Sequence, residues 1–92
     1  YSSDNAQLLE MYDYKNLAKL WYGELKTMQQ IDEIYIQQII QKSKDVLNIS
    51  GKNLFIPIRL MMIGKEHGPD LYTIINLLGK KESLTRIKFN LT

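Results

Sequence analysis

The chain has 92 residues, of which 45% are hydrophobic and 24% are charged, and its formal net charge is +2. This length allows one small domain with a single core, and the composition is that of a globular rather than a disordered chain. The sequence contains no cysteine, which excludes disulfides and thiolate metal sites, and it has neither a signal-peptide pattern nor the ~18-residue apolar run of a membrane span.

Charge is divided unevenly along the chain. Residues 1–50 contain five lysines against seven Asp or Glu, a balance of −2, whereas residues 51–92 contain seven Lys or Arg against three acids, a balance of +4. A basic half weakly favours a polyanionic partner over a neutral one.

Two helices are predicted in residues 3–28. The first is short, with Asp4 as its N-cap and Gln7 in the capping-box position. The second begins at Tyr14, because apolar residues then recur with the spacing of one helix face. These residues are Tyr14, Leu17, Ala18, Trp21, Leu25 and Met28. We expect Trp21 to lie in the core rather than to serve as a platform for base stacking.

A third helix, of about four turns, is predicted to end near Leu47. Its apolar residues are Ile31, Ile34, Tyr35, Ile36, Ile39, Ile40, Val46 and Leu47. The β-branched isoleucines could indicate a strand, but the run is too long for one and does not alternate with polar residues. Asp32 and Glu33 are expected in the first turn, and residues 48–51 end the helix.

Residues 54–63, which read LFIPIRLMMI, are the most apolar stretch of the chain, and Arg59 is their one charged residue. A helix that is apolar all round belongs in the middle of a bundle. Asn53 is expected to cap this helix, Pro57 to lie near its first turn and Gly64 to end it. Two interpretations of Arg59 stay open. In the first, Arg59 pairs with a carboxylate or reaches water at a wet edge of the helix. In the second, the helix holds Arg59 in a fixed position where it meets an external anion or the edge of a base.

Two more helices are predicted after a polar loop. Gly68 is expected to cap the first, with Pro69 at its first position and Asp70 at its second. Its buried stripe is Leu71, Ile74, Ile75 and Leu78, and Gly79 follows as its end. The last helix is expected from about Lys81 to Phe89, with an ion pair between Glu82 and Arg86 and with inward residues Leu84, Ile87 and Leu91. The predicted fold class is all-α: a compact bundle of five or six short helices.

The sequence predicts no catalytic site. Its one histidine, His67, lies in the polar loop, where we expect it to be solvated, although it could touch an RNA base. Without a second His or a Cys, no metal site can be proposed. No glycine-rich phosphate loop, nucleophile elbow or inward pair of carboxylates is present either.

Residues 51–87, GKNLFIPIRLMMIGKEHGPDLYTIINLLGKKESLTRI, resemble the C-terminal segment of bacterial-type glutamyl-tRNA synthetases. In that family the segment reads as Gly-Lys, a Phe-x-Pro-x-Arg helix, a glycine-bounded loop, Gly-Pro-x-Leu, Leu-Leu-Gly-Lys-Glu and a final Arg-Leu, at the same spacing. Here Lys81-Glu82 replaces the more usual acidic pair, and Met61-Met62-Ile63 replaces a run of smaller residues. Residues 1–50 match only in their helical character.

The resemblance implies that residues 1–92 form a single C-terminal anticodon-binding subdomain of the α-helical cage type. The parent would be a cytoplasmic class I glutamate–tRNA ligase that uses ATP and Mg, whereas this piece would bind no cofactor and catalyse nothing. Its partner would be glutamate tRNA, met through the anticodon loop, with no membrane involved, and we expect a monomer. A chain that begins with Tyr1 also suggests a piece of a longer polypeptide.

The resemblance also implies site residues. Arg59 would approach the first anticodon base, beside a wall made by a turn. The residues of that turn are Gly68, Pro69, Asp70 and Leu71. Independently, a splayed base can be read by a rigid guanidinium fork together with backbone groups at a helix start. Lys65 and Lys88 are expected to contact phosphates.

The alternative is a free-standing helical module for protein interaction. Its contact surface would be the glutamine-rich face of residues 29–41. This alternative predicts no tRNA binding and little dependence on salt.

Overall fold

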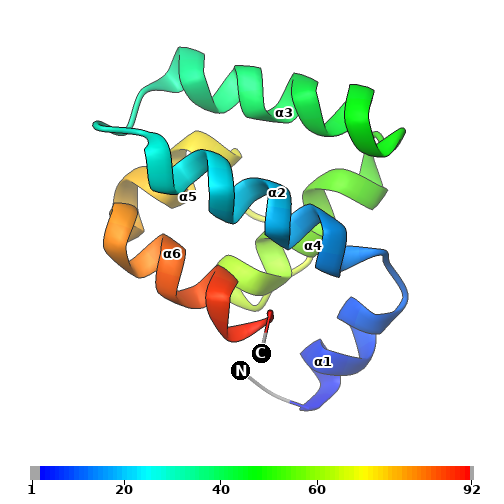
Figure 1. The fold of residues 1–92 in the computed structure, drawn as a ribbon. Helices are drawn as coiled ribbons and strands as arrows, with labels where there is room; N and C mark the ends of the chain where they lie inside the picture. Colours follow the sequence, from blue (N-terminus) through cyan, green and yellow to red (C-terminus); the bar gives the residue numbers. More distant parts are fainter. Residues whose placement is uncertain (1–2, 92) are drawn as a thin grey trace.

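The computed structural model describes the backbone of residues 3–91 and the side chains of residues 7–91, and this part of the chain is folded into helices without strands (Figure 1). The helices are α1 (Ser3–Glu10), α2 (Tyr14–Thr27), α3 (Glu33–Leu47), α4 (Lys52–Ile63), α5 (Leu71–Leu78) and α6 (Lys80–Phe89). The radius of gyration is 11.9 Å, close to the ~12 Å expected of a folded domain of this length. The predicted all-α bundle is confirmed.

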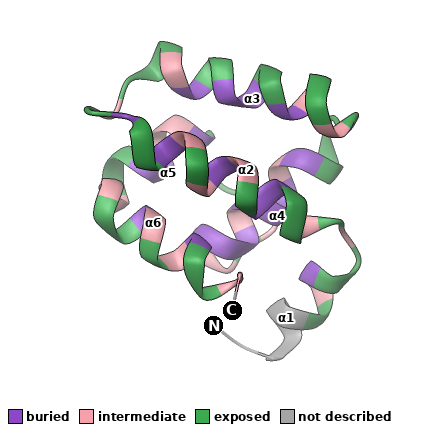
Figure 2. Ribbon diagram, in the orientation of Figure 1, coloured by how far each residue is buried: buried purple, intermediate pink, exposed green. Residues whose placement is uncertain are grey.

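Helix α4 lies in the middle of the bundle and contacts each of the other five helices. Figure 2 shows that the buried residues of the chain face the interior of the bundle, with α4 crossing it. The buried residues of α4 are Leu54, Ile56, Pro57, Ile58, Leu60, Met61 and Met62. The prediction of a central apolar helix is therefore confirmed, as is its end at Gly64, which adopts the left-handed conformation (φ 69°).

The start of α4 differs from the prediction. The helix begins at Lys52, and Gly51 rather than Asn53 is its N-cap. The carbonyl oxygen of Gly51 already accepts hydrogen bonds from the backbone N–H groups of Leu54 and Phe55, so the first helical turn closes ahead of Asn53. Gly51 itself has φ 56°, which glycine adopts without steric cost. Pro57 consequently lies in the second turn of the helix instead of the first.

Trp21 joins α2 to α3 inside the core. Its side chain is fully buried, and its indole N–H donates to the hydroxyl of Ser43 over 3.0 Å. Ser43 in turn donates to the carbonyl oxygen of Ile39 over 2.8 Å. The expectation that Trp21 is a core residue is confirmed. Outside the core, Lys42 pairs with Glu24 across the same two helices.

Helix α3 is positioned largely as predicted. Asp32 is its N-cap and accepts a 2.9 Å hydrogen bond from the backbone N–H of Ile34. However, two of the apolar residues that predicted this helix are on its surface: Ile34 is 69% exposed and Val46 is 60% exposed. Ile34 precedes the buried Ile36 by two residues, a rotation of about 200° that turns it to the opposite side of the helix.

The remaining boundaries differ by small amounts. Helix α1 begins at Ser3, one residue before the expected cap Asp4, whose side chain lies outside the described residues. Helix α6 begins at Lys80, and its predicted pair is present, with 3.0 Å between Arg86 Nε and Glu82 Oε1. Leu78, Leu84 and Leu91 are only partly buried against the core. None of the described helices is long and apolar enough to cross a membrane.

Replacing Ser43 with alanine tests the link between α2 and α3. Ser43→Ala leaves the buried indole N–H of Trp21 without its acceptor, which costs about 1–3 kcal/mol. The melting temperature should fall by roughly 4–8 °C per kcal/mol in a domain of this size, as measured by far-UV circular dichroism. Ser50→Ala is the matched control, because Ser50 is exposed in a loop, and it should change stability by less than about 0.5 kcal/mol. Equal effects of the two changes would contradict this role of Ser43.

Candidate nucleic-acid interface

Arg59 lies on the least buried edge of α4. The other partly buried residues of this edge, Phe55 and Ile63, stand one helical turn before and after it. The Nε–H of Arg59 donates to the carbonyl oxygen of Pro69 over 3.2 Å, and its guanidinium carbon lies 5.7 Å from the centroid of the Phe55 ring. Both contacts restrict the long side chain, and the second is a cation–π contact.

The two interpretations of Arg59 can now be compared. Within the described residues, ion pairs join Lys42 to Glu24 and Arg86 to Glu82, and Arg59 has no carboxylate partner. Of the first interpretation, the pair with a carboxylate is therefore wrong, and the position at a wet edge is right. The two Nη groups of Arg59 make no hydrogen bond within residues 7–91. They remain able to donate to an external acceptor.

The turn before α5 differs from the prediction. Helix α5 begins at Leu71, and Asp70 is its N-cap rather than its second residue, so Gly68 and Pro69 both precede the helix. The Asp70 side chain accepts from the backbone N–H of Thr73 over 3.4 Å and from the Thr73 hydroxyl over 2.6 Å. A glycine at the cap could supply neither acceptor, which explains why the helix starts two residues later than expected.

This later start leaves the carbonyl oxygen of Pro69 available to Arg59. Had α5 begun at Pro69, the N–H of Thr73 would bond to that carbonyl, but here it bonds to the Asp70 carboxylate. The structure thus brings Arg59 and the turn together through one hydrogen bond. Gly68 also approaches α4 closely, because a Cβ atom at that position would lie 3.0 Å from Cδ1 of Ile63.

The other predicted site residues take different positions. Leu71 is only 2% exposed, so it supports the turn by packing in the core and offers little surface to a partner. Lys65 is exposed in the loop after α4, and Lys88 is exposed on α6. His67 is also exposed in the loop, as expected. Within the described residues, no hydrogen bond joins either lysine to Arg59.

Hydrogen bonding at the turn before α5 also changes the pKa of Asp70. The hydrogen bond from the Thr73 side chain, assisted by backbone N–H groups, lowers the pKa of Asp70 below its ordinary value of 3.8. Asp70 is therefore a carboxylate at neutral pH, and its negative charge stands at the N-terminal end of α5, where the helix dipole favours it.

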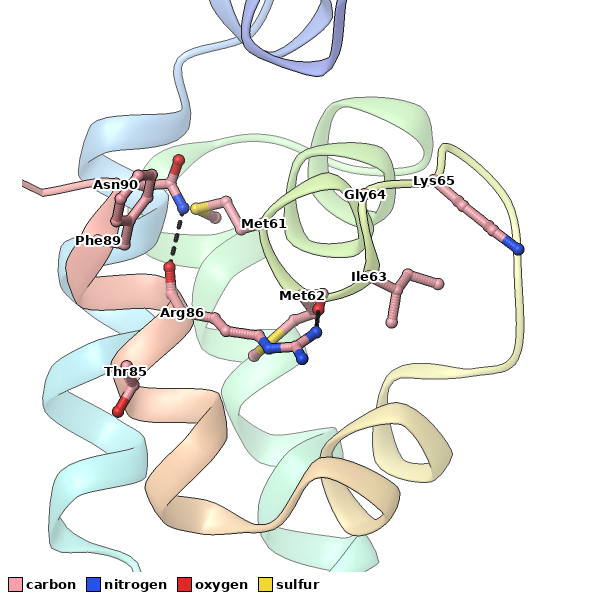
Figure 3. Close-up of a pocket in the computed structure, with 9 residues that line it drawn as sticks. All are labelled: Met61, Met62, Ile63, Gly64, Lys65, Thr85, Arg86, Phe89 and Asn90. Carbon is pink, nitrogen blue, oxygen red and sulfur yellow. Dashed lines mark hydrogen bonds between the residues drawn. The ribbon is translucent and has the colours of Figure 1, made fainter. Parts of the chain in front are cut away.

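Two contacts were missed by reasoning from the sequence. Arg86 was assigned only a pair with Glu82, but its Nη1 also donates to the carbonyl oxygen of Met62 and so joins α6 to the end of α4. A cavity of about 460 Å³ lies beside this contact (Figure 3). The cation–π contact of Arg59 with Phe55 was also missed, although their four-residue spacing on one helix would have indicated it.

Comparison with known proteins identifies the family. The anticodon binding domain family matches residues 3–91, which is nearly the whole chain. The chain belongs to the anticodon-binding domain family. No solved structure matches it significantly. Within the described residues, no cluster of three or more His, Cys, Asp or Glu could hold a metal ion.

Three curated relatives of this anticodon-binding domain are glutamate–tRNA ligases. It is 35% identical over 80 residues to a glutamate–tRNA ligase of Mycoplasma capricolum, covering 87% of this chain and 17% of the relative. It is 43% identical over 79 residues to a glutamate–tRNA ligase of Mycoplasma genitalium, covering 82% of this chain and 16% of the relative. It is 31% identical over 85 residues to a glutamate–tRNA ligase of Staphylococcus xylosus, covering 92% of this chain and 71% of the relative. The chain therefore spans about a sixth of the length of the two Mycoplasma relatives.

The lowered pKa of Asp70 predicts that the stability of the domain depends on pH. Folding lowers the pKa of the Asp70 carboxyl group, so the ionised group stabilises the fold. This stabilisation is fully present above the pKa of Asp70 in the unfolded chain, and it is lost as the pH falls through the lower pKa of the folded state. Asp70→Asn keeps a capping side chain but cannot ionise. Its melting temperature should lie a few degrees below that of the unchanged protein at pH 6, and the difference should shrink below about pH 3.8.

Thr73→Ala provides the control for this measurement, since it removes the hydroxyl donor to Asp70. In that background, Asp70→Asn should have a smaller effect at pH 6. A difference in melting temperature between the unchanged protein and Asp70→Asn that stays constant from pH 6 to pH 2.5 would contradict the role given to the carboxylate.

Proposed function

We propose that this domain is the C-terminal, anticodon-reading part of a glutamate–tRNA ligase. The observation that carries the proposal is the family match over residues 3–91, supported by relatives that are glutamate–tRNA ligases. The whole enzyme would attach glutamate to its tRNA with ATP and Mg in the cytoplasm. The domain would contribute recognition of the anticodon loop, acting as one monomeric unit, and would neither bind a cofactor nor catalyse a step.

Arg59 would read the first anticodon base. Its Nε–H donates to the carbonyl oxygen of Pro69 and its guanidinium makes a cation–π contact with Phe55, so little side-chain entropy is lost when a base binds. A guanidinium held in this way presents its Nη donors in a fixed geometry, which suits paired acceptors on a base edge. Bases of single-stranded loops expose such edges.

The turn before α5 would form the wall beside that base. Gly68 and Pro69 are exposed, so the base could lie against them. A phosphate would be disfavoured there, because the Asp70 carboxylate already occupies the N-terminal end of α5. The charge at this turn therefore favours a neutral base over a phosphate group. Phosphate contacts are assigned instead to Lys65 and Lys88, which are exposed on other elements.

Arg59→Gln tests the proposed base contact. This change removes the guanidinium fork but keeps much of the aliphatic stem, so the fold should survive with a melting temperature shifted by a few degrees. In the ligase, discrimination at the first anticodon base should weaken by about 5- to 150-fold, corresponding to roughly 1–3 kcal/mol. Arg59→Lys should lose discrimination too, since an ammonium has no fork.

Lys88→Gln is the control for this experiment. A phosphate contact carries no sequence information, so this change should weaken the binding of all tRNA variants by the same factor. Charging of tRNAs that differ at the first anticodon base measures both effects. Unchanged base discrimination in Arg59→Gln would contradict the assignment of Arg59.

Salt dependence separates this proposal from a protein-interaction module. The glutamines of the alternative surface are exposed, so that surface is accessible. Gln37, Gln38 and Gln41 lie on α3 with Ile34, whereas Gln29 and Gln30 lie in the loop before the helix. Binding to tRNA should depend on salt, although only weakly, because a balance of +4 over residues 51–92 can neutralise few phosphates. With about two to four phosphates neutralised, the log–log slope of affinity against salt should be roughly −1.5 to −3.5. Titration of labelled tRNA at several salt concentrations measures the slope, and no binding at low salt would favour the alternative.

A further inference from the structure

A cavity of about 460 Å³ lies between the C-terminal end of α4 and the second half of α6, a size typical of ligand pockets. We call it the α4–α6 pocket. Figure 3 shows Met61 and Met62 between the two helices, with Phe89 on the α6 side and Ile63 on the α4 side. These residues give the pocket a largely apolar lining. The Phe89 side chain is 66% exposed, so its ring is accessible at the rim.

Two cationic residues also line this pocket. Lys65 belongs to the exposed loop that leaves α4, and Arg86 crosses from α6 to the carbonyl oxygen of Met62. The charge of Arg86 is partly compensated by Glu82, whereas Lys65 has no ion pair within the described residues. An apolar cavity with an aromatic rim and an unpaired lysine beside it has the chemistry of a single-strand binding site. There, a base stacks on the ring and a cation meets the phosphate.

The pocket is adjacent to the proposed anticodon site. Ile63, which lines it, lies one helical turn after Arg59 on the same edge of α4. The Ile63 side chain also approaches Gly68, and Gly68 precedes the proline whose carbonyl oxygen holds Arg59. The Ile63 end of the pocket therefore lies about one helical turn from Arg59, and Phe89 lies at the other end (Figure 3).

We propose that the α4–α6 pocket takes a second unstacked base of the same anticodon loop, stacked on Phe89 at one end of the pocket, with the RNA backbone following the pocket towards Lys65 at its other end (Figure 3). The proposal rests on the proposed function, because it needs an RNA loop at Arg59. It adds a site that is separate from the turn before α5 and that binds by stacking, so it tolerates different bases. The two cationic residues at the pocket, Lys65 and Arg86, complement an anionic RNA backbone better than an apolar protein segment.

The test uses the chain and a stem-loop RNA with a seven-nucleotide anticodon loop, labelled with 2-aminopurine at one loop position at a time. Phe89→Leu removes the ring and should weaken binding by about 5- to 10-fold, the lower part of the range for a stacked base, because the ring is largely exposed. Phe89→Tyr keeps the ring and should bind as the unchanged chain does. At one loop position, 2-aminopurine fluorescence should be quenched on binding to the unchanged chain and not to Phe89→Leu.

Two further variants control for effects of the substitutions on folding. Thr85 lines the pocket and is exposed, so Thr85→Phe should fill the pocket without disturbing the core and should weaken binding like Phe89→Leu. Leu77→Ala is the matched control, since Leu77 is an exposed apolar residue on α5 outside the pocket (77% exposed), and it should leave binding unchanged. With an abasic site at the quenched position of the stem-loop, the unchanged chain and Phe89→Leu should bind equally.

The outcomes separate this proposal from the proposed function. If Phe89→Leu and Thr85→Phe both bind the RNA as tightly as the unchanged chain, the pocket does not take a base, and a protein segment is its better occupant. If Phe89→Leu weakens binding equally with and without the base, stacking is also overturned. Either result leaves base reading by Arg59 intact as long as Arg59→Gln loses discrimination. Failure of the unchanged chain to bind the RNA at low salt would overturn both proposals.

Discussion

The burial of α4 is the constraint on which the rest of this domain depends. The helix has no polar face, so stability requires other elements to cover it on all sides, and each of the other five helices contacts it. Glycines fix both of its ends through positive φ angles, 56° at Gly51 and 69° at Gly64. Because α4 is covered so completely, the one charged residue within its apolar stretch must lie at the edge that remains open, and that residue is Arg59.

This placement gives the proposed site its rigidity. Arg59 projects from a helix that cannot shift without opening the core, and its Nε is tied to the turn before α5. The end of the same helix is tied to α6 by Arg86, which leaves the α4–α6 pocket beside the contact. Both proposed base sites therefore depend on one buried helix. Recognition groups held on rigid elements are positioned more accurately than groups held on loops.

Electrostatics has a secondary role in this domain. The basic balance of residues 51–92 is small, and Arg86 is engaged with Glu82. The turn before α5 bears a carboxylate, Asp70, whose pKa is lowered by the Thr73 hydroxyl. Such a surface attracts phosphates only weakly. Base contacts and stacking would then supply most of the specificity, as is usual for single-stranded RNA.

The sequence by itself determined the helices, the central place of residues 54–63, the core role of Trp21 and the pair of Glu82 with Arg86, because periodicity and four-residue spacing are local properties. It also carried the resemblance that led to the family. The tertiary structure decided the rest. Asp70 rather than Gly68 caps α5, because its carboxylate accepts two hydrogen bonds from Thr73. Gly51 rather than Asn53 precedes α4, with a positive φ angle that glycine adopts without steric cost. The contact of Arg59 with Pro69, the bond from Arg86 to Met62 and the pocket beside it join segments 10 and 24 residues apart. No local pattern encodes these contacts, since they depend on how the helices cross once the core has formed.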